Sequence, residues 1–208
     1  RDNLPLLEFR RVLFRSLKKC RARQEAVAVK NKASRPIVGV VGEIYVRSNE
    51  FSNENALKAI EGFGGEAWLP PISEWFLYTN ETNFMRAKLE GTWGELAHLK
   101  LHHHFQEKDL HQLEAVYKGF LKNFHEPAIK ETFDYADPYL DPSFEGEAIL
   151  SIGKCKDFIL KGASGLVNIM PFTCMPGIIV TALLKRFRDD NDSIPFLNLA
   201  YDGQEQTN

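Results

Sequence analysis

The chain has 208 residues, of which 44% are hydrophobic and 12% aromatic, enough apolar material to bury the core of one globular domain. Its 26 Lys and Arg against 28 Asp and Glu give a formal net charge of −2, without the basic face that nucleic-acid binding requires. No apolar run approaches the roughly 20 residues of a membrane-spanning helix, and three cysteines exclude a disulfide-dense secreted scaffold. We therefore predict a soluble, cytoplasmic domain with no nucleic-acid or membrane partner.

The first sixteen residues look foreign to the rest. Residues 7–16 read LEFRRVLFRS, the translation of CTG GAG TTC AGA CGT GTG CTC TTC CGA TCT, which ends a widely used sequencing adapter. We expect residues 1–16 to be a sequencing artefact without functional information, although they would also suit a basic amphipathic helix. Residues 17–34 suit a short helix and a linker. The chain starts without Met and stops just after a predicted strand, so we expect an internal fragment of a longer protein.

Four short apolar runs predict the strands of a parallel sheet, at residues 37–41, 67–69, 165–170 and 195–200. The first run is continuous and β-branched, which is typical of a strand covered on both faces. Helical patterns separate the runs: one helix is capped by Ser52 or Asn53 and ends near Gly62, and two more are expected over residues 145–160 and 176–188.

A helical insertion interrupts this α/β pattern. Residues 74–130 carry no strand signal, and apolar side chains recur there at helical spacing (Leu110, Leu113, Val116, Tyr117, Phe120, Leu121, Phe124). A Pro-rich loop is expected at residues 134–142. The whole predicts one domain over residues 35–208, with an α/β, flavodoxin-like parallel sheet in strand order 2-1-3-4 and the insertion outside the sheet.

In a sheet of this kind, ligands bind beyond the carboxyl ends of the strands, where the strand order reverses. Three segments are expected to meet there, at residues 42–53, 171–177 and 201–206. Within them, Glu43, Tyr45 and Asp202 are candidates to line a substrate cleft. For Glu43, anchoring of the turn through backbone N–H groups is an equally good interpretation.

Cys174 is the strongest candidate for a metal-binding or reactive residue. It lies in the segment PFTCMPG, between a buried strand and a helix whose first turn suits Pro176. Backbone N–H groups and the helix dipole at such a position favour a thiolate, which binds metals or attacks electrophiles. The alternative is a small buried cysteine that only packs.

The other candidates for chemistry carry weaker signals. Cys155 shares a helical stripe with Ala148, Ile152 and Ile159, which indicates core packing, and Cys20 receives no role. His98 and His102 have metal-ligand spacing, and His103, His104 and His111 follow, but an exposed face of the insertion explains them as well. Gly153-Lys154 lacks the upstream glycine of a phosphate-binding loop, so ATP binding by this chain is not expected.

Three stretches resemble the 2-hydroxyacyl-CoA dehydratase subunit family, especially its activase-related and double-cubane-cluster branch. They are RPIVGVVGEIYVRSNEFSNENALKAIEGFGGEAWLPP, GEAILSIGKCKDFILKGASGLVNIMPFTCMPG and IPFLNLAYDGQEQTN. The resemblance spans residues 35–208 and is weak through the insertion. It implies an iron–sulfur cluster held between flavodoxin-like domains, with Cys174 as one ligand because Pro171, Phe172, Cys174 and Pro176 match the family's PF-x-C-x-P element.

The resemblance also implies a partner and a reaction. An ATP-dependent activase, fused or separate, would inject a low-potential electron, and in true dehydratases this electron allows loss of a hydroxyl group from an acyl-CoA. Gly177 departs from the Glu that typical dehydratases have there, which favours the activase-related branch. The remaining cluster ligands would lie outside this chain, so the chain alone is not expected to be active. A non-catalytic module that docks an activase or binds a CoA-type ligand is the alternative.

Overall fold

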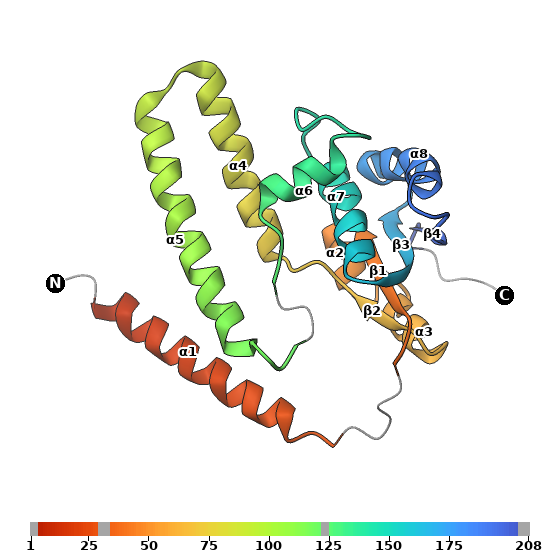
Figure 1. The fold of residues 1–208 in the computed structure, drawn as a ribbon, viewed down its shortest axis with the longest axis horizontal. Coiled ribbons are helices and arrows are strands. Elements are labelled where there is room, and N and C mark those ends of the chain that lie inside the picture. Colours follow the sequence, from red (N-terminus) through yellow and green to blue (C-terminus); the bar gives the residue numbers. More distant parts are fainter. Residues whose placement is uncertain (1–3, 29–33, 122–124, 204–208) are drawn as a thin grey trace. The chain divides into compact units, whose positions relative to one another are not determined.

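The computed structural model describes residues 4–28, 34–121 and 125–203 (Figure 1). In chain order, the helices and strands are α1 (Leu4–Glu25), β1 (Ile37–Gly42), α2 (Ile44–Ser48), α3 (Ala56–Gly62), β2 (Glu66–Trp68), α4 (Ser73–Glu90), α5 (Trp93–Tyr117), α6 (Ile129–Ala136), α7 (Glu147–Leu160), β3 (Ala163–Pro171), α8 (Met175–Asp189) and β4 (Phe196–Tyr201). They form two compact units, one of residues 1–33 and 79–126, the other of residues 34–78 and 127–208.

The second unit is built on a four-stranded, all-parallel sheet in the order β2-β1-β3-β4 (Figure 1). This confirms the α/β, flavodoxin-like class and the strand order 2-1-3-4. Each predicted strand is present, with ends that move by at most two residues. β1 and β3 form the centre because both are apolar on two faces, whereas the edge strand β2 has only three residues.

The two faces of the sheet are covered by different helices. Val40 of β1 and Ile169 of β3 pack with Val46 of α2 and Ala56 of α3 in one buried cluster. Neighbouring strand residues point the other way, toward α7 and α8: a Cβ added to Gly39 would lie 2.4 Å from the Phe158 ring of α7. The period of two along each strand therefore divides the core into two layers.

Several local expectations differ from the structure. The helix α2 was not predicted, because Glu43 begins a helix immediately after Gly42, whose φ of +109° turns the chain out of β1. The N-cap of the next helix, α3, is Asn55 and not Ser52 or Asn53, although the Asn53 side-chain oxygen accepts from the N–H of Ala56 at 3.2 Å. The loop expected over residues 134–142 begins later, since α6 continues to Ala136.

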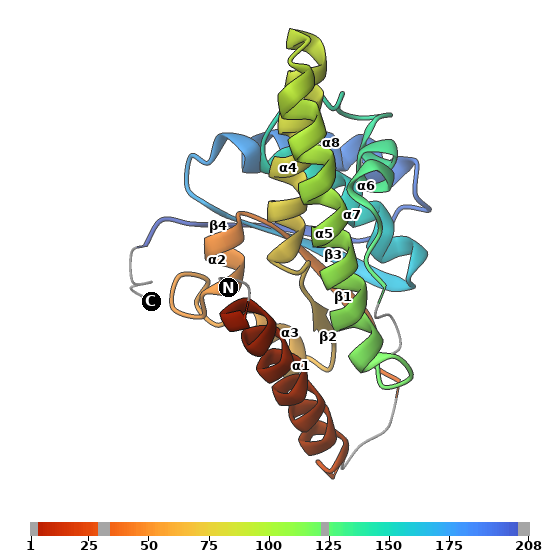
Figure 2. The same cartoon turned by 90° about the vertical axis from the view of Figure 1, so that its left-hand side faces the viewer.

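Among its described residues, the first unit contains helices joined by turns and no β-strand, as predicted for the insertion. The part of α4 from residue 79 onward and α5 are joined by a turn at Gly91, and α1 lies beside α5 (Figure 2). An Arg21 guanidinium nitrogen donates to the Val116 carbonyl of α5. α1 is one continuous helix through residues 7–16, which is the form expected of a basic amphipathic helix. Phe124 and residues 31–33 lie outside the described residues.

Candidate functional site

The carboxyl edge of the sheet brings the three predicted segments together. The Glu43 N–H donates to the Ile169 carbonyl at 2.9 Å, which ties the first segment to β3. The Phe172 N–H donates to the Tyr201 carbonyl at 2.7 Å, which ties the second segment to the third. Burial raises the pKa of Tyr201, and the nearby carboxylate of Glu54 raises it further. Residues 204–206 lie outside the described residues, so the convergence is established for residues 201–203 only.

Cys174 is the residue on which β3 passes into α8. It is the N-cap of α8 with extended φ and ψ of −65° and 114°, its N–H donates to the Pro171 carbonyl at 3.1 Å, and its own carbonyl accepts from the Ile178 N–H at 2.9 Å. Thr173 just before it has φ of +65°, a left-handed conformation that is unusual for a β-branched residue. Cys174 is therefore held in a defined, strained turn and is partly exposed.

A close approach of α8 to β3 sets the position of this turn. A Cβ added to Gly177 would lie 2.7 Å from Cβ of Met170 and 2.3 Å from its sulfur, so a larger residue would push the helix away from the strand. Pro176 in the first turn of α8 needs no hydrogen-bond acceptor, because the first N–H groups of a helix have no intrahelical partner. Pro176 and Gly177 thus allow α8 to begin immediately after Cys174.

The three cysteines have different surroundings. Cys155 is fully buried in α7, and burial raises the pKa of its thiol, as expected of a packing residue. Cys20 is exposed on α1, in the first unit. Cys174 is thus the one cysteine that lies at the carboxyl edge of the sheet.

The proposed cleft residues have distinct positions. Both carboxylate oxygens of Glu43 cap α2, accepting from Tyr45 N–H at 3.1 Å and Val46 N–H at 2.6 Å. Its turn-anchoring role is therefore the one that the geometry supports. Tyr45 is exposed, and its hydroxyl accepts from the Asn49 amide at 3.2 Å. Asp202 is exposed just beyond β4.

Metal-binding groups were searched over the described part of the chain. No set of three or more His, Cys, Asp and Glu side chains that could hold an ion occurs there. The rings of His98 and His102 stack with centroids 6.3 Å apart on the exposed side of α5, in the first unit. The residues present at the carboxyl edge therefore fit one ligand of a metal cluster, Cys174, and not a complete ligand set.

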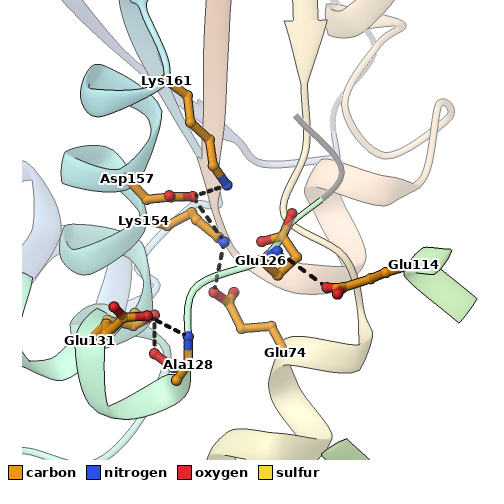
Figure 3. Close-up of polar contacts among 9 residues, drawn as sticks. Glu74, Glu114, Glu126, Ala128, Glu131, Lys154, Asp157 and Lys161 are labelled. Carbon is orange, nitrogen blue, oxygen red and sulfur yellow. Dashed lines mark hydrogen bonds and ion pairs between the residues drawn. The ribbon is translucent and has the colours of Figure 1, made fainter. Parts of the chain in front are cut away.

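A buried ionic cluster that the sequence did not reveal joins α4 and α7. Lys154 is 1% exposed, and its ammonium lies 3.4 Å from Glu74 and 3.2 Å from Asp157 (Figure 3). Lys161 approaches the same Asp157 carboxylate at 2.9 Å. The one sequence signal was a lysine placed among apolar residues of α7. In the folded chain it ties α7 to the start of α4.

Arg47 extends this polar region toward the carboxyl edge. It is buried, and its Nε has no hydrogen-bond partner. Burial lowers the pKa of its guanidinium, and the carboxylates of Glu74, Glu147 and Glu43 act in the opposite direction. Burial raises the pKa of Glu147, whose carboxylate also accepts from the Ile44 N–H at 3.4 Å. Glu43 and Glu147 thus both hold the start of α2.

Comparison with known proteins gives no relative: no protein-family model, no curated protein and no solved structure matches the chain. The class of the protein therefore comes from its fold, a four-stranded parallel α/β sheet of the flavodoxin-like type with helices on both faces. No helix in the described residues is long and apolar enough to cross a membrane.

Proposed function

We propose that this chain is the cluster-bearing part of an iron–sulfur redox component that accepts a low-potential electron from an ATP-dependent activase. The system would be a 2-hydroxyacyl-CoA dehydratase or a related reductase. The observation that carries the proposal is the place of Cys174, which is partly exposed at the start of α8 where three loops meet. A cysteine kept only for packing would be enclosed, as Cys155 is.

The local chemistry suits a thiolate ligand. α8 has 15 residues, and the positive end of its dipole favours the negative charge of a metal-bound thiolate at the N-cap. When bound, an iron–sulfur cluster would supply one-electron chemistry at a low potential. This chain would contribute Cys174, and thiolates outside the chain would complete the ligand set.

The surface around Cys174 suits contact with another protein. Phe172 and Met175 are each 68% exposed, and Ile178, one turn into α8, is 54% exposed. Exposed apolar side chains that gather in this way typically mark an interaction site. We assign this surface to the activase or to the part of the system that completes the cluster, with an acyl-CoA as the substrate class.

Anaerobic loading of the complete protein with ferrous iron and sulfide tests the proposal. We expect the wild type and Cys155→Ala to take up iron and sulfide and to show cluster absorbance and an EPR signal after reduction. Cys174→Ala should lose most of both signals while keeping its fold by circular dichroism. Full cluster loading in Cys174→Ala would contradict the proposal.

A second function has one observation in its favour. The exposed apolar side chains of Phe172, Met175 and Ile178 also suit a non-catalytic module that docks an activase or binds a CoA-type ligand. In that case, iron uptake would be absent in the wild type, and binding of the activase or of coenzyme A would be insensitive to Cys174→Ala.

A further inference from the structure

A hydrogen-bond network joins the sheet to α8, on the face that α7 and α8 cover. Asn168 lies in the middle of β3 and is 0% exposed. Its Nδ2 donates to the Asn198 Oδ1 at 3.0 Å, to the Thr181 Oγ1 at 3.3 Å and to the Gly177 carbonyl at 3.4 Å. The Thr181 hydroxyl lies 2.9 Å from the same carbonyl and 3.1 Å from the Asn198 Oδ1. We call these three side chains and the Gly177 carbonyl the Asn168 network.

An amide is an unexpected side chain at this position. The residues of β3 that share its face, Leu166 and Met170, are apolar and buried. Burial of an amide is unfavourable unless hydrogen bonds replace those that it made to water, and the Asn168 Oδ1 has no hydrogen-bond partner in the described residues. An apolar side chain would avoid this cost. The Asn168 network therefore contributes something other than stability, and its contacts with α8 indicate what this is.

The network fixes α8 in a direction that apolar packing does not. The close approach of Gly177 to Met170 sets how near the helix lies to β3. Hydrophobic contact is non-directional, so it opposes movement of the helix along its own axis only weakly. Hydrogen bonds have narrow limits of length and angle. The bonds from Asn168 to Gly177 and to Thr181, one turn further along α8, therefore fix the helix along its axis.

The position of α8 along its axis also sets the position of Cys174. Cys174 is the N-cap and precedes Gly177 by three residues (177 minus 174), less than one turn of helix. Thr173 just before it has a left-handed φ of +65°, and such a conformation persists only where the surrounding structure holds it. Release of α8 from β3 would let Thr173 relax and would move Cys174 with it.

We propose that Asn168 is a positioning residue for Cys174. Through the Asn168 network it holds the start of α8 in the place that presents the Cys174 thiol at the carboxyl edge of the sheet. The inference rests on the proposed function, which gives the thiol a cluster to bind, and it names the residues that set the place of this ligand. Because Asn168 is fully buried, it acts through α8 and not by contact with the iron.

The rate of Cys174 alkylation in the folded protein, before any iron is added, tests the proposal. Asn168→Leu removes the amide but keeps the number and branching of side-chain atoms, and Thr181→Val removes only the hydroxyl. We expect each to raise the rate by about threefold or more at fixed pH, because the released turn exposes the thiol. Thr181→Ser keeps the hydroxyl and should react as the wild type does. A packing role for Thr181 would give the opposite order, since valine keeps the methyl group that serine lacks.

Val40→Ala is the matched control for a general loss of stability. Val40 is fully buried on the opposite face of the sheet, with α2 and α3, so its truncation should lower the melting temperature without changing the Cys174 rate in native conditions. Buried Cys155 should stay unreacted in every folded variant. If Asn168→Leu fails to fold, Thr181→Val against Thr181→Ser decides the test. Unchanged Cys174 rates in the folded network variants, or an equal change in Val40→Ala, would overturn the proposal.

Loading of the complete protein with iron and sulfide separates this proposal from the proposed function. We expect Asn168→Leu and Thr181→Val to bind a cluster whose EPR spectrum differs from that of the wild type, and Thr181→Ser to give the wild-type spectrum. Wild-type spectra in both network variants would show that the network does not set the place of the ligand. A wild type that binds no cluster would contradict the proposed function, while the alkylation rates would still decide the role of Asn168.

Discussion

The Lys154 ammonium lies 3.4 Å from the Glu74 carboxylate inside the second unit, and both side chains are almost wholly buried. The pair connects α7 to the first turn of α4, and Asp157 and Lys161 extend it along α7 (Figure 3). Buried charges are stable only when they are paired, so each member depends on the others. The ionic cluster thus fixes α7 to the first turn of α4.

Replacement of Lys154 by Met should be strongly destabilising. It leaves the carboxylates of Glu74 and Asp157 in a buried site with one cation fewer. We expect a loss of about 3–5 kcal/mol in the free energy of unfolding, the usual cost of breaking a buried ion pair from one side. Urea denaturation measures it. Lys161→Met is the matched control, because Lys161 is less buried and Asp157 keeps Lys154, and it should cost no more than about 1–2 kcal/mol. Equal losses would contradict the assigned role of Lys154.

Glu147 should make stability depend on pH. Burial raises the pKa of its carboxyl group in the folded chain, and the neighbouring Glu43 adds to this shift. The folded state therefore holds this proton more tightly than the unfolded state does. The contribution of Glu147 to stability is full below its unfolded pKa of about 4.3 and is lost as the pH rises through the folded pKa.

The variant Glu147→Gln isolates this effect, since an amide does not ionise but still offers an oxygen to the Ile44 N–H. We expect the free energy of unfolding of the variant, minus that of the wild type, to increase as the pH rises from about 4 to about 7. Urea denaturation at several pH values gives this difference. A difference that stays constant or decreases as the pH rises would contradict a raised pKa of Glu147 in the folded chain.

Gly177 should be sensitive to a single methyl group. A Cβ there would meet Cβ of Met170 at 2.7 Å, whereas the nearest atom to a Cβ at Gly165, also in this unit, is 3.6 Å away. We expect Gly177→Ala to cost about 1–3 kcal/mol through overpacking, with a change in the reactivity of the neighbouring Cys174 thiol. Thermal unfolding and thiol titration measure both. Gly165→Ala should leave the thiol unchanged, and equal behaviour of the two variants would contradict the close-packing explanation.

The sheet could be predicted from the sequence because each strand is a local apolar run. Residues 37–41 include no polar side chain, and Cys155 falls on an apolar helical stripe, so the burial of Val40, Val41 and Cys155 follows from pattern alone. The position of Cys174 follows in the same way, since it is the residue between a strand and a helix that begins with proline.

The polar interior could not be predicted in this way. Arg47 and Glu74 are 27 residues apart in sequence (74 minus 47), and nothing local indicates that both approach α7. The helix α2 was missed for a related reason. Its five residues are too few for a periodic pattern, and its start depends on the carboxylate of Glu147 as well as on Glu43. Such contacts depend on the tertiary arrangement.

Removal of residues 1–16 should leave the protein as stable as before. We expect this because residues 7–16 match the translation of a sequencing adapter. In addition, the described side chains of residues 11–16 are mostly exposed. We expect the melting temperature of the shortened chain to equal that of the full chain within error. A loss of more than about 2 kcal/mol, the contribution of one well-buried apolar side chain, would identify the segment as native structure.

Differential alkylation tests most directly whether Cys174 ligates a cluster. The folded protein is treated anaerobically with a thiol reagent before and after loading with iron and sulfide, and each cysteine is quantified by mass spectrometry. Cys20 is exposed and should react in both states, while the buried Cys155 should react in neither. We predict that Cys174 reacts before loading and is protected afterwards. Equal labelling of Cys174 in the two states, with iron and sulfide bound, would contradict its role as a ligand.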